Sequence, residues 1–301
     1  MKEHSFEGRV AVVTGAGRGI GRAHALLLAD RGARVVANDL GGSIEGVGAD
    51  AGPASTVAAE IVAAGGAALA DTSDVATAAG AQALVDAAVE RFGRLDILIN
   101  NAGIMRWAGF PEADADNLGT HLAVHVGGSF NTTRAAWPRM VEQGYGRVVM
   151  TTSTGMFGLP NNLSYATAKA GVIGLTRSLT NAGAEHGIKV NAIAPAAFTR
   201  MAGQAVDNLP EATHMAPGLV APMVAFLAHE DCPVSGEIYA AGAGRFARIF
   251  IAETEGYVHP TGTPTVEDVA QHWATINEET GYSIPADLVS WSNAFMAHLS
   301  R

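Results

Sequence analysis

Val10-Ala-Val-Val-Thr-Gly-Ala-Gly-Arg-Gly-Ile-Gly21 is the stretch of sequence that decides the fold. The apolar run from Val10 to Val13 predicts a short buried strand, and the apolar periodicity from Ile20 to Arg31 predicts a helix directly behind it. The glycines between them allow a sharp backbone turn, because glycine has no side chain to clash. The sequence therefore predicts a strand, a glycine turn and a helix in immediate succession.

The same alternation continues along the chain. Further strands are predicted at residues 34–39, 67–70, 95–100, 147–152 and 188–193, and helices at residues 55–64, 78–92, 117–142 and 163–186. Strands separated by helices need crossover connections, which favour a parallel sheet covered on both faces. The predicted fold class is α/β, a Rossmann-type doubly wound parallel sheet with helices on both faces.

The alternation stops near Gly244, and the tail that follows has helical patterns. Two apolar stripes at helical spacing run along it: Val266, Val269, Trp273 and Ile276, then Leu288, Trp291, Phe295 and Leu299. We expect residues 1–245 to form the catalytic Rossmann domain. Residues 246–301 are expected to form a C-terminal helical extension packed on the same domain or on a neighbouring subunit. A second interpretation is that the tail helps to close the substrate pocket.

Composition narrows the classes of function. The 301 residues are 48% hydrophobic and 16% charged, which suits a packed globular core, and the net charge of −10 disfavours nucleic acid or anionic lipid as partners. We find no apolar run near the ~20 residues of a membrane helix and no secretory signal in residues 1–8. The single cysteine, Cys232, leaves no internal disulfide and lacks an adjacent base for nucleophilic work. These features predict a cytoplasmic protein.

The glycine turn is a candidate dinucleotide-binding site. Its pattern T-G-x-x-x-G-x-G lies between strand and helix, where free N–H groups and the helix dipole attract a pyrophosphate. Asp39 ends the second strand, 18 residues after Gly21. Its carboxylate would accept hydrogen bonds from the adenine ribose and repel a 2′-phosphate, which favours NAD(H). Arg18 argues weakly for NADP(H), and Asp39 could instead be a simple turn former. The candidate turn contacts are Gly15, Gly17, Arg18, Gly19, Ile20 and Gly21.

Tyr165 and Lys169 are the candidate catalytic pair. They lie four positions apart on a predicted helix and so share one face. A nearby ammonium favours the phenolate and lowers the pKa of the tyrosine towards neutrality, which suits proton exchange with a substrate hydroxyl. The pair therefore indicates interconversion of an alcohol and a carbonyl.

Four motifs in this order, Thr14–Gly21, Asp74-Val75, Asn100–Gly103 and Tyr165–Lys169, resemble the short-chain dehydrogenase/reductase family over residues 8–245. The resemblance implies that Tyr165 is the general acid/base and that Lys169 lowers its pKa and binds the nicotinamide ribose. It implies further cofactor contacts at Asp74, Val75, Asn101, Ala102, Gly103, Pro195 and Thr199. It also implies a homotetramer with residues 117–142 and 163–186 at the interface.

Two positions depart from the family pattern. The family usually has a serine 13 residues before the tyrosine, which hydrogen-bonds the substrate oxygen. That position is Thr152 here, so we expect Thr152 in this role, with Ser153 as the close alternative. The asparagine that usually links the lysine to a water chain is replaced by His125, whose imidazole could do the same relay work. His121 and His125 have a metal-clasping spacing, but without a third ligand we expect no metal site.

Several segments narrow the substrate by resemblance. Residues 38–42 and 46–48, Val124-His125 and residues 145–147 resemble the (3R)-hydroxyacyl-CoA dehydrogenase region of peroxisomal multifunctional enzyme type 2. This implies a lipid-like secondary alcohol, a 3-hydroxyacyl-CoA or a hydroxysteroid. The alternatives are a reductase of a small ketone or a 3-ketoacyl thioester, and a catalytically silent dinucleotide-binding regulator. Residues 196–217 are expected to be a lid. Six apolar residues could line the pocket or simply pack loops: Met105, Trp107, Phe157, Leu159, Phe198 and Met201.

Overall fold

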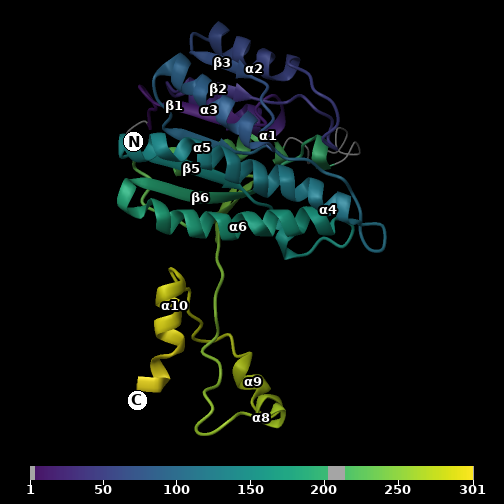
Figure 1. Ribbon diagram of the computed structural model, residues 1–301, viewed down its shortest axis with the longest axis vertical. Coiled ribbons are helices and arrows are strands. Elements are labelled where there is room, and N and C mark those ends of the chain that lie inside the picture. Colours follow the sequence, from purple (N-terminus) through teal and green to yellow (C-terminus); the bar gives the residue numbers. More distant parts are fainter. Residues whose placement is uncertain (1–3, 203–213, 301) are drawn as a thin grey trace. The chain divides into compact units, whose positions relative to one another are not determined.

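A computed structural model describes residues 4–202 and 214–300 of the protein (Figure 1). The predicted lid therefore lies partly outside the described residues. The chain divides into two compact units, Met1–Arg248 and Ile249–Arg301. Each unit is described by itself.

The first unit is built on one sheet whose strand order is β3-β2-β1-β4-β5-β6-β7-β8. Neighbouring strands from β3 through β7 are all parallel. The order reverses between β1 and β4, and ligands of doubly wound sheets bind at such a switch point. The predicted fold class is confirmed. The strands are β1 (Val10–Thr14), β2 (Arg34–Asn38), β3 (Ala68–Asp71), β4 (Ile97–Asn100), β5 (Gly146–Thr151), β6 (Ile188–Pro195), β7 (Ile238–Gly242) and β8 (Arg245–Ile249).

Helices cover both faces of this sheet (Figure 1). One set consists of α1 and the helices that contact it, α2 and α7; the other set consists of α3, α5 and α6. The central strands β1, β4 and β5 are buried along their whole length, as a sheet covered on both faces requires. The helices are α1 (Gly19–Asp30), α2 (Gly52–Ala63), α3 (Ala78–Phe92), α4 (Ala115–His121), α5 (Gly128–Gln143), α6 (Leu163–Gly183) and α7 (Ala221–Ala228).

The long helix predicted at residues 117–142 is interrupted. It begins at Ala115, where the Asp114 side chain accepts a hydrogen bond from the Asn117 amide at 2.8 Å. A π-helical segment, Leu122–Gly127, separates α4 from α5. Such segments add a residue to one turn and often mark functional sites. Apolar periodicity cannot reveal this change, because it shifts a side chain around the helix without altering composition.

Three elements near the end of the first unit were not predicted: helix α7 and the strands β7 and β8. Helix α7 follows residue 220, and β8 adds a strand beyond Gly244. Strands β7 and β8 are joined by Ala243 and Gly244 alone, with φ of 51° and 73°. Two central residues with positive φ match a type I′ hairpin, which makes this last pair antiparallel.

The second unit contains α8 (Val266–Gln271), α9 (Trp273–Ile276) and α10 (Leu288–Phe295). Thr265 and Asp268 cap the start of α8 with reciprocal side-chain to backbone bonds. No described side chain of these helices is buried, and most residues of the two apolar stripes are exposed to solvent. The packing partner of the tail stays a prediction.

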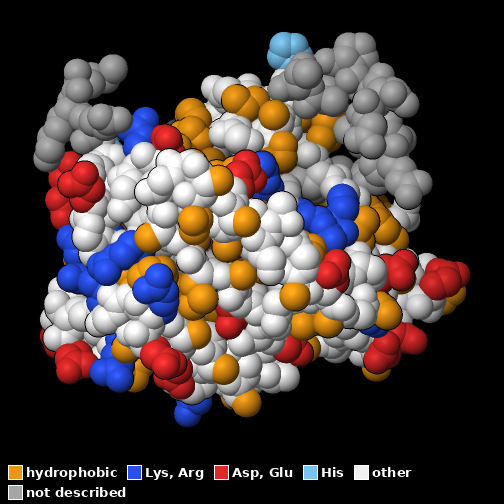
Figure 2. All heavy atoms as spheres, turned by 90° about the horizontal axis from the view of Figure 1, so that it is seen from above, with side chains coloured by type: hydrophobic (Ala, Val, Ile, Leu, Met, Phe, Trp, Pro, Cys, Tyr) orange, Lys and Arg blue, Asp and Glu red, His pale blue; other side chains and the backbone are white. Residues whose placement is uncertain are grey.

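Two surface features bear on partners. Among the residues the structure describes, none of the helices combines the length and apolar character needed to cross a bilayer. The face drawn in Figure 2 carries acidic and basic side chains interspersed with apolar ones. Such mixed charge is typical of an ordinary protein surface.

Candidate active site

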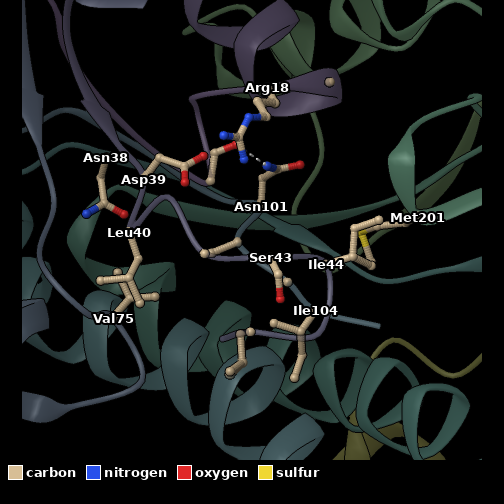
Figure 3. A pocket seen from close by; sticks show the side chains of 18 of the residues that line it. Arg18, Asn38, Asp39, Leu40, Ser43, Ile44, Val75, Asn101, Ile104 and Met201 are labelled. Carbon is tan, nitrogen blue, oxygen red and sulfur yellow. Dashed lines mark hydrogen bonds between the residues drawn. The ribbon is translucent and has the colours of Figure 1, made fainter. Parts of the chain in front are cut away.

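A pocket opens at the carboxyl ends of β1, β2 and β4, at the switch point of the sheet (Figure 3). Of the predicted cofactor contacts, it is lined by Gly15, Arg18, Gly19, Ile20, Gly21, Asp39, Asp74, Val75, Asn101, Ala102, Gly103 and Thr199. The remaining predicted contacts, Gly17, Pro195, Tyr165 and Lys169, are not in its lining. The site therefore brings together segments that are far apart in sequence.

The glycine turn has room for backbone only. Gly15 and Gly19 have φ of +65° and +54°, a region that residues with a Cβ rarely adopt. A Cβ on Gly21 would lie 2.1 Å from the Gly15 carbonyl oxygen. The Asn101 side chain closes the turn from β4, because its Nδ2 donates to the Thr14 and Gly15 carbonyls at 3.0 and 3.2 Å. The Ala16 and Gly17 amides of the turn donate to the Asn38 carbonyl and the Asp39 carboxylate, so the amides suited to a phosphate are those at the start of α1.

Asp39 lies at the end of β2 and faces the glycine turn. Its Oδ2 accepts a hydrogen bond from the Gly17 amide at 2.8 Å, and its Oδ1 accepts one from the Gly41 amide at 2.7 Å. The carboxylate therefore stabilises a turn and also lines the pocket, and its contact with an adenine ribose stays a prediction. Arg18 lies at the same end of the pocket (Figure 3). Burial and the charge of Arg18 lower the pKa of Arg200, whereas Asp39 raises it. The Arg200 guanidinium is therefore a second cation close to Arg18 and Asp39.

The segment after β3 forms the neighbouring wall. Val75 is buried, and the Asp74 carboxylate accepts a hydrogen bond from the Ala76 amide at 3.0 Å. Sequence reasoning missed Asn38, whose Nδ2 donates to the Asp71 carboxylate at 2.7 Å and to the Ser73 carbonyl at 3.0 Å. Asn38 thereby ties the ends of β2 and β3 together. Its position next to Asp39 was the available signal.

Tyr165 and Lys169 lie in the first two turns of α6. The helix begins at Leu163, and the Asn162 side chain caps it by accepting a hydrogen bond from the Tyr165 amide at 3.3 Å. The Lys169 side chain is almost fully buried, and its ammonium donates to the Thr151 carbonyl at 2.7 Å. Burial lowers the pKa of Lys169 to about 7. The ammonium lies 5.7 Å from the centre of the Tyr165 ring.

The pKa of Tyr165 differs from expectation. Burial raises it above the ordinary value, and hydrogen bonding with Ser153 lowers it in part. The predicted lowering by Lys169 is not among these causes. The reason is physical: burial penalises the phenolate, while the lysine carries less charge near neutral pH and is directed at the Thr151 carbonyl.

Thr152 and Ser153 point in different directions at the end of β5. Thr152 is fully buried, and its hydroxyl donates to the Lys169 carbonyl at 2.7 Å. Ser153 is half-buried, accepts a hydrogen bond from the Gly155 amide at 3.0 Å and interacts with the Tyr165 hydroxyl. The geometry therefore corrects the preference for Thr152, because its hydroxyl is occupied by the backbone. The alternative, Ser153, faces the tyrosine.

Two histidines lie behind the tyrosine. The His125 ring meets the Tyr165 ring edge-on at 5.3 Å and stacks on the His121 ring at 5.9 Å between centroids. Both ring nitrogens of His121 are hydrogen-bonded within the protein. Nδ1 lies 2.8 Å from the Asn117 carbonyl oxygen, and Nε2 accepts a hydrogen bond from the Arg106 amide at 3.2 Å. His121 therefore has no free nitrogen with which to join His125 in binding a metal ion.

His125 is a neutral, buried base. Burial, followed by the charge of Lys169, lowers its pKa well below the ordinary value. Its Nε2 lies 3.0 Å from the Ile104 carbonyl oxygen and 3.4 Å from the Ile104 amide nitrogen, which donates to it. Its Nδ1 is buried and has no protein partner among the described residues. This nitrogen is therefore the one His125 ring atom that no other described group of the protein satisfies.

The six apolar candidates for the substrate pocket differ in their exposure. Met105 is buried and accepts a hydrogen bond from the Asn162 side chain, whereas Trp107 and Phe157 are largely exposed. Met201 lines the cofactor pocket instead. Residues 203–213 of the expected lid lie outside the described part of the chain.

Comparison with known proteins agrees with this geometry. Residues 9–209 match the short chain dehydrogenase family. The chain is 42% identical over 279 residues to a short-chain type dehydrogenase/reductase of Mycobacterium tuberculosis, covering 92% of this chain and 96% of that protein. It is 40% identical over 284 residues to mouse peroxisomal multifunctional enzyme type 2, covering 93% of this chain but only 38% of the mouse protein.

Two solved structures are similar over most of the chain. Full-length peroxisomal multifunctional enzyme type 2 from Drosophila melanogaster has a TM-score of 0.82 and 31% identity, with 98% of this chain and 50% of that chain covered. A short chain dehydrogenase from Mycobacterium avium has a TM-score of 0.76 and 37% identity, with 91% of this chain and 97% of that chain covered. Together with the glycine turn and the Tyr165–Lys169 pair, these likenesses show that the chain is an oxidoreductase of the short-chain dehydrogenase/reductase family.

Proposed function

We propose that this enzyme interconverts a secondary alcohol and a ketone with NAD(H), using Tyr165 as the general acid/base. The observation that carries the proposal is the set of groups around Tyr165, beside a pocket suited to a dinucleotide. The Ser153 side chain hydrogen-bonds to the phenol, and the Lys169 ammonium lies 5.7 Å from the centre of the ring. A silent regulator would have no use for a buried lysine and a hydroxyl beside this phenol. The family's chemistry makes the enzymatic alternative the stronger one.

Each side chain has a role in this scheme. NAD⁺, when bound, supplies the acceptor for the hydride that leaves the carbinol carbon. Ser153 hydrogen-bonds the substrate oxygen and Tyr165 removes the hydroxyl proton, so the oxygen becomes a carbonyl. Lys169 holds positive charge beside the phenolate and binds the nicotinamide ribose, the latter from the family resemblance.

His125 completes a proton path. We place the proton on Nε2, facing the Ile104 carbonyl, so that the unpartnered Nδ1 accepts a hydrogen bond from a water near Lys169. The imidazole would thus replace the relay asparagine of the family as an acceptor. Its lowered pKa supports a neutral relay across the physiological range.

Asp39 supports NAD(H) over NADP(H). Its carboxylate lines the pocket at the end of β2, where the adenine ribose binds in this fold, and a negative charge there repels a 2′-phosphate. Arg18 and Arg200 moderate that repulsion. We give the carboxylate more weight because the backbone amides of Gly17 and Gly41 fix its position.

A 3-hydroxyacyl-CoA or hydroxysteroid-like lipid is the proposed substrate. Support comes from the relatives named peroxisomal multifunctional enzyme type 2, of which this chain spans less than half. A relative named 3-oxoacyl-[acyl-carrier-protein] reductase, 39% identical over 188 residues, supports the alternative of a ketoacyl thioester. Exposed apolar side chains on α4, the π segment and α5 (Leu118, Leu122 and Phe130) support the proposed homotetramer. A cytoplasmic location stays a prediction.

The test is a substrate scan of the purified enzyme with NAD⁺ and NADP⁺. We expect turnover of 3-hydroxyacyl-CoA esters or hydroxysteroids with NAD⁺, followed as NADH absorbance. Turnover of small alcohols alone would contradict the proposed substrate class. Absence of NADH binding to the wild-type enzyme would contradict the proposed function altogether.

A further inference from the structure

The loop after β2 crosses the cofactor pocket and closes on itself. Its central part, residues 43–47, is called the strap below. The Ser43 amide donates to the Val47 carbonyl at 2.9 Å, and the Ser43 hydroxyl accepts bonds from the Glu45 and Val47 amides at 3.2 Å. Ser43, Ile44 and Gly46 line the pocket, while Val47 is exposed on the outside. Figure 3 shows Ser43 and Ile44 on this segment, opposite Arg18 and Asn101.

The strap is held against the loop after β4. The Met105 amide donates to the Ile44 carbonyl at 2.8 Å, and the Arg106 Nε donates to the Glu45 carbonyl, also at 2.8 Å. Gly46 packs so closely that a Cβ there would lie 2.9 Å from Cγ2 of Ile104. Three consecutive residues after β4 thus fix three consecutive residues of the strap.

Arg106 continues this connection into α4. Its guanidinium Nη1 donates to the Thr120 hydroxyl at 3.2 Å and to the Asp116 carboxylate at 3.4 Å. Its carbonyl accepts a bond from the Asn117 side chain at 3.2 Å. Its amide donates to Nε2 of His121, the ring that stacks on His125 behind the tyrosine. One residue therefore contacts the strap, the start of α4 and the histidine pair.

We propose that Arg106 is a positioning residue that anchors the strap over the bound dinucleotide and so sets the rate at which the cofactor leaves. The inference rests on the proposed function, since it assumes a dinucleotide in this pocket. A ligand beneath residues 43–47 must break the strap contacts with Met105 and Arg106 before it escapes. The Arg106 side chain holds the strap, and the backbone amide of the same residue donates to His121, so one residue connects the strap to the catalytic end.

The test compares two pairs of variants by stopped-flow measurement of NADH dissociation. Arg106→Ala should raise the dissociation rate about tenfold, because a charged donor to the strap is lost. Its control is Arg139→Ala, which removes an exposed ion pair to Glu142 on α5 and should leave the rate unchanged.

The second pair separates closure of the strap from loss of charge. Gly46 and Gly48 share a φ of +81°, but a Cβ on Gly48 meets nothing within 4 Å. Gly46→Ala should lift the strap and speed NADH release several-fold, whereas Gly48→Ala carries the same backbone strain without the clash. The proposal also predicts a raised KM for NAD⁺ in Gly46→Ala, with kcat changed less.

Equal NADH dissociation rates in wild type, Arg106→Ala and Gly46→Ala would overturn the proposal while leaving the proposed function intact. Failure of the wild-type enzyme to bind NADH would refute both. If Arg106→Ala does not fold, the glycine pair still decides the question.

Discussion

At the cofactor end of the site, the polar contacts join side chains to backbone: Asp39 accepts from Gly17 and Gly41, and Asn101 donates to the turn after β1. At the catalytic end, buried titratable groups lie together, and burial shifts the pKa values of Tyr165 and Lys169. The first arrangement sets a shape, and the second sets protonation states. Changes at the cofactor end should therefore alter which ligand binds, whereas changes at the catalytic end should alter rates and their pH dependence.

The sharpest test of this difference is Tyr165→Phe. Loss of the general acid/base should reduce kcat by about a thousandfold while NADH affinity stays within a few-fold of wild type. Because the pKa of Tyr165 is raised, wild-type alcohol oxidation should speed up as pH rises and more phenolate forms. The residual rate of the variant should not follow that profile. Steady-state kinetics and NADH fluorescence titration provide the measurements, and a large loss of NADH affinity would mean that the tyrosine is chiefly a binding residue.

Ser153→Ala and Thr152→Val break the catalytic end in different ways. Removing the Ser153 hydroxyl, which faces Tyr165, should lower kcat about a hundredfold. Removing the Thr152 hydroxyl, which donates to the Lys169 carbonyl, should cost about 1 kcal/mol of unfolding free energy and lower kcat far less. Chemical denaturation and kinetics on both variants separate the two effects. The reverse ranking of kcat would restore Thr152 as the residue that binds the substrate oxygen.

Asp39→Ala tests the cofactor end. Without the carboxylate, kcat/KM for NADP⁺ relative to NAD⁺ should rise about tenfold, which corresponds to loss of one charge-assisted contact. Asp30→Ala, on the exposed end of α1, is the control and should leave the ratio unchanged. An unaltered ratio in Asp39→Ala would mean that the carboxylate acts only through Gly17 and Gly41.

The smallest expected effect is a pH dependence of stability from His24, on α1 behind the glycine turn. Burial lowers its pKa from 6.5 to about 3, and neither ring nitrogen has a partner among the described residues. Below pH 6.5 the His24 side chain takes up a proton in the unfolded chain but not in the folded chain. The free energy of unfolding therefore decreases as the pH is lowered from 6.5 towards 3. Between pH 7 and 5.5 this amounts to about 1 kcal/mol. His24→Leu should reduce the slope measured by denaturation, and an unchanged slope would assign it to other groups.

Much of the frame could be predicted from local pattern. The glycine turn, the alternation of strands and helices and the i, i+4 spacing of Tyr165 and Lys169 are short-range properties, and they sufficed for the fold class and the family. Pattern could not reveal the π segment at Leu122–Gly127, because the sequence keeps its helical periodicity through it. The β7–β8 hairpin was also missed, since it depends on Ala243 adopting a positive φ.

The sequence by itself determined the parallel sheet, the position of the glycine turn and the identity of the tyrosine and lysine, because backbone preference and spacing act over a few residues. Only the tertiary structure decided that Ser153 rather than Thr152 faces the tyrosine, that burial raises the pKa of Tyr165, and that Arg106 joins the strap to His121. Each of these depends on which groups from distant segments share one small volume. Burial and hydrogen-bond direction there are settled by packing, which no local pattern records.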